Sequence, residues 1–185
     1  YGVFANGGYL KQPYFIEKII DVKGRKIKQN FSITNEETPR IIDPRNAFIM
    51  NSLLQEVVNT GTARKAKRLK RQDIAGKTGT TNDLVDAWFA GFNPDIVTIT
   101  WMGFDQPRTL GKHESGSRAA LPIWIDYMKP IIKEYPIKIL ETPDGIIPLR
   151  INPKNGMLAD KDEDGIYEYF YDEFLPPSNA YFILN

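Results

Sequence analysis

The 185-residue sequence contains no cysteine and only one histidine, His113. The first absence excludes disulfides, thiolate metal sites and a cysteine nucleophile, and the second excludes a metal centre built from several histidines. The 24 lysine and arginine residues nearly balance the 23 aspartate and glutamate residues, so the net charge of +1 gives no general attraction to nucleic acid. No apolar run approaches the length of a membrane span. The hydrophobic fraction of 42% is that of an ordinary folded domain.

The first third of the chain predicts a helix end, a hairpin and a full helix. Residues 1–5 have the apolar spacing of a helix that stops at the following glycines, so we expect the chain to begin inside a larger protein. Alternating residues at 9–20 and 26–33 predict two strands joined by a turn. Asp43, followed by proline, predicts the start of a helix that ends at Gly61.

The segment 64–71 is strongly basic. Charge runs of this kind are usually a solvated linker or helix face, and we favour that interpretation. Contact with phosphate or a lipid headgroup is the alternative. Because no aromatic residue interrupts the run, stacking on single-stranded nucleic acid is not expected.

The middle of the chain predicts three strands, at 74–81, 87–92 and 96–104. The connection 93–95, Asn-Pro-Asp, is so tight that the last two strands are expected to be antiparallel neighbours.

Two different patterns follow the strands. Residues 119–134 predict a long amphipathic helix with a kink at Pro130. Prolines punctuate residues 136–148, which predict a linker, and the acidic, aromatic residues 149–185 predict a tail with short strands at most.

The segment Gly76-Lys77-Thr78-Gly79-Thr80-Thr81 places a cation, several hydroxyls and a glycine at the end of a predicted strand. Because side chains alternate along a strand, one site can use all of them only at the strand's edge. A peptide along that edge would exchange backbone hydrogen bonds, and the central glycine would leave room for it. The hydroxyls would bind a carboxylate, and a backbone N–H would face an oxyanion. The alternative is a surface strand end, since the short motif alone is a weak signal.

Further segments extend this motif in a fixed order. They are Tyr-Gly-Val-Phe-Ala-Asn-Gly-Gly at 1–8, Gly-Thr-Ala-Arg at 61–64, residues 75–83, Asp-Ala-Trp-Phe-Ala-Gly-Phe at 86–92, Trp-Met-Gly-Phe-Asp at 101–105 and Ala-Leu-Pro-Ile-Trp at 120–124. The set resembles the transpeptidase domain of class A (bifunctional) penicillin-binding proteins. The resemblance is close over residues 1–134 and looser over 135–185. It therefore implies two parts: the C-terminal part of a transpeptidase domain, then a linker and a C-terminal extension.

The resemblance implies an α+β fold, part of the penicillin-binding serine transpeptidase architecture, with an antiparallel sheet, covering helices and the extension. It implies crosslinking of peptidoglycan, in which a serine attacks the stem peptide at D-Ala-D-Ala, and binding of β-lactams. It implies no metal, organic cofactor or nucleic acid. The parent protein is expected to be anchored in the inner membrane through an N-terminal segment, with this domain outside the cytoplasm.

The family's site residues carry over to matching positions of this sequence. Lys77 would line the cleft and support its hydrogen bonds, Thr78 and Thr80 would hold the substrate carboxylate, and the N–H of Thr80 would complete the oxyanion hole. The catalytic candidates are therefore Lys77 and Thr80, and the substrate-binding candidates are Thr78, Gly79, Thr80, Thr81 and Trp88. A core or rim aromatic is the favoured interpretation of Trp88.

One departure limits what this chain is expected to do alone. The family's nucleophile lies in Ser-x-x-Lys, and a second motif is Ser-x-Asn. The serines of this chain are Ser32, Ser52, Ser115, Ser117 and Ser178, and none of them fits either pattern. Both motifs precede the Asn-Gly-Gly segment in the family, so we expect them upstream and expect the fragment alone to be inactive. A non-catalytic fragment that binds peptide or a partner, and a D,D-carboxypeptidase relative, remain the alternatives.

Two other patterns carry weaker signals. Residues 160–165 match the first half of a calcium-binding loop, but Tyr171 stands where the bidentate glutamate belongs, so an acidic surface turn is favoured. His113, Glu114 and Ser115 are residue types of a catalytic triad, but neighbours in sequence do not have triad geometry, so a polar loop is favoured.

Overall fold

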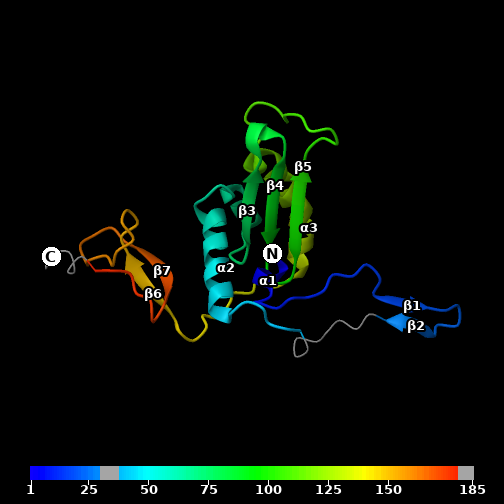
Figure 1. The fold of residues 1–185 in the computed structure, drawn as a ribbon, viewed down its shortest axis with the longest axis horizontal. Helices are drawn as coiled ribbons and strands as arrows, with labels where there is room; N and C mark the ends of the chain where they lie inside the picture. The colour runs from blue at the N-terminus through cyan, green and yellow to red at the C-terminus, as the bar shows by residue number, and fades with distance from the viewer. Residues whose placement is uncertain (30–37, 179–185) are drawn as a thin grey trace.

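The computed structural model describes residues 1–29 and 38–178. At its centre lies a three-stranded antiparallel sheet in the order β3-β4-β5, formed by Ala75–Thr80, Ala87–Phe92 and Val97–Met102. Figure 1 shows helix α2 running alongside β3 and helix α3 behind the sheet. The α+β class, the three strands and their antiparallel pairing are confirmed, although β3 and β5 are shorter than predicted.

The turn between β4 and β5 is closed by one side chain. Asn93 is fully buried, and its Oδ1 accepts hydrogen bonds from the backbone N–H of Asp95 at 3.2 Å and of Ile96 at 2.8 Å. An asparagine that caps its own turn in this way fixes a tight connection, which is why the two strands are neighbours.

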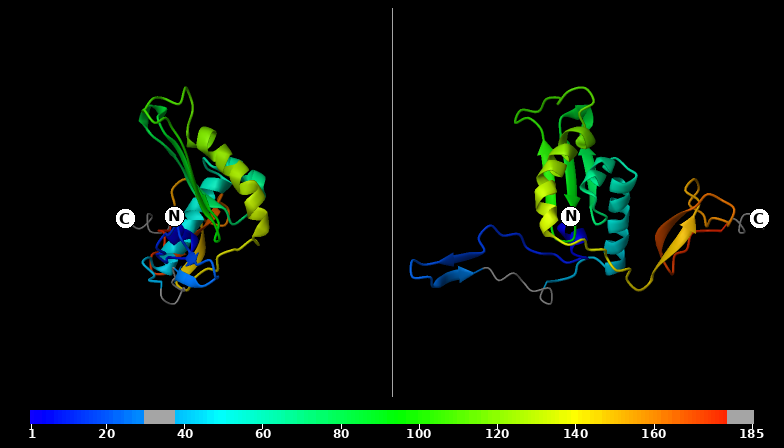
Figure 2. Two further views of the ribbon diagram at one scale, coloured as in Figure 1. Left: turned by 90° about the vertical axis from the view of Figure 1, so that its right-hand side faces the viewer. Right: turned by 180° about the vertical axis from the view of Figure 1, so that it is seen from behind.

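Helix α3, Leu121–Ile131, covers one face of the sheet (Figure 2). The π-helical turn η3, Gly116–Ala120, precedes it and the 3-10 turn η4, Ile132–Glu134, follows it. The helical region therefore begins three residues earlier than the predicted residue 119, and it consists of three segments. Trp124 anchors α3, because its ring packs edge-on against Phe89 at 5.1 Å and its Nε1 donates to the carbonyl of Thr98 at 3.0 Å. Both rings are completely buried, so this contact is the centre of the core.

Helix α2, Pro44–Asn59, begins as predicted: the side chain of Asp43 accepts a hydrogen bond from the N–H of Arg45 at 2.9 Å. Its end differs from the prediction. Gly61 is not in the left-handed region, and a Cβ there would lie 2.9 Å from the Cα of Val57. The glycine therefore permits a close approach of the backbone instead of reversing it.

The basic segment forms the 3-10 helix η1, Arg64–Leu69. Ala66 is buried against the core while the lysines and arginines of residues 64–70 face outward, as the helix-face interpretation predicts. The interpretation is wrong for Arg71, the last residue of the basic segment, because its side chain is only 9% exposed.

The N-terminal part consists of α1, Gly2–Ala5, and a hairpin of β1, Lys18–Ile20, and β2, Lys26–Gln29. Figure 1 shows this hairpin projecting away from the central sheet. The predicted strand at 9–20 is wrong over most of its length, because Pro13 interrupts it and cannot donate to a ladder. Positions 30–33 of the predicted return strand lie outside the described residues.

The C-terminal part is more regular than predicted. Strands β6, Ile146–Ile151, and β7, Ile166–Tyr171, pair as a separate antiparallel hairpin of six residues per strand, and β6 begins inside the predicted linker. The hairpin contacts α2 through the rings of Tyr169 and Phe48 at 4.9 Å and through an ion pair of Arg45 with Glu173 at 2.8 Å.

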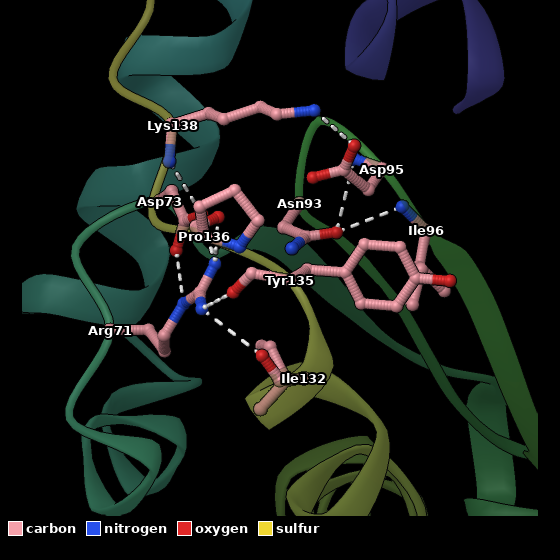
Figure 3. Close-up of polar contacts among 9 residues, drawn as sticks. All are labelled: Arg71, Asp73, Asn93, Asp95, Ile96, Ile132, Tyr135, Pro136 and Lys138. Atoms are coloured by element: carbon pink, nitrogen blue, oxygen red, sulfur yellow. Dashed lines mark hydrogen bonds and ion pairs between the residues drawn. The ribbon is translucent and has the colours of Figure 1, made fainter.

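Arg71 ties the segment after α3 to the base of the sheet (Figure 3). Its Nε and Nη2 donate to the carboxylate of Asp73 at 2.8 and 2.5 Å, and its other donors reach the carbonyls of Ile132, Tyr135 and Pro136. The five N–H groups of an arginine are thereby all used. The same carboxylate accepts the N–H of Lys138 at 3.2 Å. We call this network the Arg71 latch.

Candidate functional site

The predicted site lies at the C-terminal end of β3, which is an edge strand within the described part of the chain. The register sets Gly79 opposite Trp88 and Thr78 opposite Phe89. Since directly opposed residues of an antiparallel pair share a face, Thr78 and Thr80 lie on the α3 side. Lys77 and Gly79 lie on the other side. The side chains of β3 therefore alternate between the two faces of the sheet, as the sequence predicts. Both the threonines and the pair of Lys77 and Gly79 border the edge of the strand.

Lys77 is exposed, and its Nζ donates to the backbone carbonyl of Thr78 at 2.9 Å. It forms no ion pair with a described residue. The ammonium group is thus a cation at the surface, and it is hydrogen-bonded to the backbone of its own strand.

The two threonine hydroxyls of β3 both have partners from other elements. Thr78 Oγ1 lies 2.8 Å from Thr62 Oγ1, in the segment that follows α2. Thr80 Oγ1 accepts a hydrogen bond from the backbone N–H of Gly116 at 3.0 Å. A Cβ on Gly116 would lie 2.4 Å from the carbonyl oxygen of Trp88, so only glycine fits against the strand there.

A constrained turn follows β3. The backbones of Thr81 and Asp86 close it, with an N–H to carbonyl bond of 3.1 Å, and the N–H of Asp86 donates to Thr81 Oγ1 at 2.7 Å. Asp83 and Leu84 inside the turn have φ of 60° and 55°. The left-handed backbone conformation is energetically unfavourable for residues other than glycine, and it persists only where the surrounding structure enforces it. Thr81 is therefore held in place by the turn.

Trp88 lies on the Lys77 side of the sheet and is 42% exposed. Its ring packs 6.1 Å from that of Trp101, whose Nε1 donates to Asp86 Oδ1 at 2.8 Å. A Cβ on Gly79 would lie 3.2 Å from the Cβ of Trp88. Trp88 is thus a rim aromatic beside the strand and not a core residue.

The structure adds three residues that the sequence interpretation assigned no role: Thr62, Asp86 and Gly116. Thr62 and Asp86 lie in segments that carried the family resemblance, so the sequence could have pointed to these residues, although it could not predict their contacts. Gly116 had no such signal, because the loop before the helix resembles ordinary polar sequence.

The two weaker patterns lie in different places: residues 160–165 belong to the C-terminal part, whereas Ser115 directly precedes Gly116, which contacts the end of β3. Arg150 donates to the carbonyl of Asp160 at 2.8 Å and also to that of Glu163, so a guanidinium lies at the acidic turn. Across residues 1–29 and 38–178, no cluster of three His, Asp or Glu residues is arranged to hold a metal ion. His113 has a φ of 71° and forms no hydrogen bond with Ser115, whose hydroxyl lies 3.1 Å from that of Ser117.

No helix in the described ranges is both long and apolar enough to cross a membrane.

Comparisons with known proteins identify the family and the fold of this chain. The family model described as penicillin binding protein transpeptidase domain matches residues 1–129. Penicillin-binding protein 1A of Neisseria lactamica is 50% identical over 80% of this chain, and that of Pseudomonas aeruginosa is 40% identical over 96% of it. The crystal structure of penicillin-binding protein 1A from Haemophilus influenzae matches 94% of the chain with a TM-score of 0.84 and 33% identity.

The chain spans less than a third of each of these relatives, namely 18%, 27% and 31% of their lengths. The family match nevertheless includes the whole central sheet and nearly all of α3. By the match of its sequence and of its fold, this chain belongs to the family of penicillin-binding protein transpeptidase domains.

Proposed function

We propose that this chain supplies the edge-strand wall of the active site of a serine D,D-transpeptidase that crosslinks peptidoglycan. The observation that carries the proposal is the end of β3, where the hydroxyls of Thr78 and Thr80 flank Gly79 on an edge strand beside the exposed Lys77. The substrate is a stem peptide ending in D-Ala-D-Ala, and β-lactams take its place.

In the proposed reaction, the stem peptide lies along the edge of β3, where Gly79 leaves room for its backbone. The hydroxyls of Thr78 and Thr80 bind the terminal carboxylate, while Thr81 contacts the substrate from the end of the strand and Trp88 contacts it from the Lys77 side. The N–H of Thr80 faces the oxyanion, and the ammonium of Lys77 turns from the carbonyl of Thr78 toward the cleft.

The chemistry is acyl transfer through an ester. A serine oxygen bonds to the carbonyl carbon of the penultimate D-Ala, the peptide C–N bond breaks, and the terminal D-Ala leaves with a proton on its nitrogen. An amine of a neighbouring stem peptide then attacks the ester, forms the crosslink and returns the proton to the serine. If water takes the place of that amine, the product is that of a carboxypeptidase.

The serine must come from outside this sequence, since the sequence contains no Ser-x-x-Lys. We propose that residues 1–134 complete a transpeptidase domain begun earlier in a longer bifunctional protein, and that residues 135–185 are its linker and extension. That protein is anchored in the inner membrane and holds this domain outside the cytoplasm. The missing serine also favours a second candidate, a module that binds peptide without turnover.

Labelling with fluorescent penicillin separates the two candidates. The complete protein should form a covalent adduct that survives denaturation, while this chain alone should not. A complete protein that binds the probe only reversibly would support the non-catalytic module. A stable adduct on the isolated chain would show that the nucleophile has been misassigned.

The role of Lys77 is tested in the complete protein. Lys77→Ala should lower the second-order rate constant of acylation by about 100-fold, the usual effect of losing one stabilising donor in a site of this kind. The exposed Lys133→Ala is the matched control and should leave the rate unchanged. Acylation of the Lys77 variant at the wild-type rate would remove this lysine from the proposed mechanism.

A further inference from the structure

We propose that Thr62 is a positioning residue, which acts through Thr78 by orienting that residue's hydroxyl hydrogen toward the substrate carboxylate. This inference rests on the proposed function, because it deepens the assignment of Thr78 to carboxylate binding. The observation that carries it is the 2.8 Å distance between the two hydroxyl oxygens.

A bound carboxylate requires hydrogen-bond donors from the protein. An ionised carboxylate only accepts hydrogen bonds, so a threonine that binds it must donate its single hydroxyl hydrogen. Thr78 then has no hydrogen left for Thr62, and the bond between them needs Thr62 as its donor. In the ligand-bound arrangement the order of donation is therefore Thr62 to Thr78 to carboxylate.

Thr80 provides a parallel within the same site. Its Oγ1 accepts from the backbone N–H of Gly116 at 3.0 Å. A backbone N–H can only donate, so the hydroxyl hydrogen of Thr80 remains available for another acceptor. Thr80 is thus supplied with a donor from a different element, and donation from Thr62 gives Thr78 the same arrangement, so that both threonines direct their own hydrogen to one ligand.

Thr62 is held where this role requires it. The N–H of Gly61 donates to the carbonyl of Glu56 at 3.1 Å, and the N–H of Ala63 donates to the carbonyl of Val57 at 2.9 Å. Ala63 is completely buried, whereas Thr62 is exposed. The hydroxyl therefore lies on a backbone fixed at both flanking residues, and replacing its side chain disturbs no core packing.

The experiment measures acylation of the complete protein by benzylpenicillin and by its methyl ester, which lacks the carboxylate. Thr62→Val should lower the acylation rate with the acid by about tenfold, the usual effect of weakening one hydrogen bond to a charged group. The rate with the ester should change less than about twofold, and Thr62→Ser should restore the rate with the acid. Thr60→Val, at a neighbouring threonine that bonds to Glu56, is the matched control and should keep the wild-type ratio of acid to ester.

A double-mutant cycle separates action through Thr78 from direct contact with the ligand. If Thr62 acts through Thr78, the double variant Thr62→Val, Thr78→Val should be no slower than Thr78→Val alone. Additive losses would overturn the inference, as would an unchanged ratio of acid to ester in Thr62→Val with wild-type melting temperature. If Thr62→Val melts early, Thr62→Ala provides the same comparison. Wild-type protein that neither compound acylates would instead overturn the proposed function.

Discussion

At the scale of single residues, the site depends on backbone contacts that leave no room for a side chain. Gly116 packs its backbone onto the end of β3, where a Cβ would lie 2.4 Å from the carbonyl oxygen of Trp88 and 2.5 Å from that of Gly79. This approach is what lets its N–H reach Thr80. The orientation of the Thr80 hydroxyl is therefore set by a residue that contributes no side chain.

Replacing this glycine should separate η3 from β3. We expect Gly116→Ala to destabilise the complete protein by about 1–3 kcal/mol, because backbone atoms must move to admit the methyl group. Acylation by benzylpenicillin should slow as well, since the bond to Thr80 lengthens. Urea unfolding and acylation kinetics measure the two effects. Gly2→Ala is the control, because a Cβ there has no neighbour within 4 Å. Equal stability of the two variants would contradict the close approach.

At the scale of elements, the Arg71 latch connects three parts of the chain. Arg71 precedes β3, its carbonyl partners follow α3, and Lys138, bonded to the same Asp73, also forms an ion pair with Asp95 in the turn between β4 and β5. The side chain of Asp73 is completely buried and that of Arg71 is 9% exposed. The path of the chain from α3 toward the C-terminal extension is thus fixed by one buried charge pair.

Removing one member of such a pair leaves a buried charge without compensation. Arg71→Met should lower the free energy of unfolding of the complete protein by about 3–5 kcal/mol, measured by urea denaturation. The double variant Arg71→Met, Asp73→Leu should recover part of the loss, because the uncompensated carboxylate is gone. The exposed Arg64→Met should have little effect. If the Arg64 and Arg71 variants unfolded at the same urea concentration, the latch would not stabilise the fold.

At the scale of the whole molecule, the two faces of the central sheet differ. Helix α3 covers one face (Figure 2), while Trp88, Ile99 and Trp101 on the opposite face are 42%, 54% and 44% exposed. Exposed apolar faces and unpaired strand edges favour association with another surface. This face is therefore expected to associate with another surface.

Expressed alone, the chain should therefore self-associate through this face. Ile99→Lys should shift the sedimentation distribution toward the monomer by introducing a charge at the centre of the apolar face. Ile123→Lys is the matched control, because Ile123 is 49% exposed on the outer side of α3, and it should leave the distribution unchanged. A wild-type chain that sediments as a monomer at all concentrations would refute the expectation.

Local signals in the sequence were sufficient for three features in which a residue acts on its own neighbours. Asp43 caps α2 as predicted, Asn93 closes the predicted turn, and the alternation around Lys77 sets the two faces of β3. Each of these depends on contacts within a few residues along the chain, so the pattern of residue types determines them. Pro13 acts just as locally, although the predicted strand at 9–20 did not take it into account.

Only the tertiary structure brought together residues that lie far apart in the chain. Thr62 reaches Thr78 across 16 positions, Gly116 reaches Thr80 across 36, and the donors of Arg71 span more than 60. No local pattern encodes such pairs, because each arises from how α2, η3 and α3 pack against the sheet. The sequence thus determined which hydroxyl-bearing residues lie at the end of β3. The packing of distant elements decided which partners their hydroxyls contact, because those partners are not contained in the local sequence.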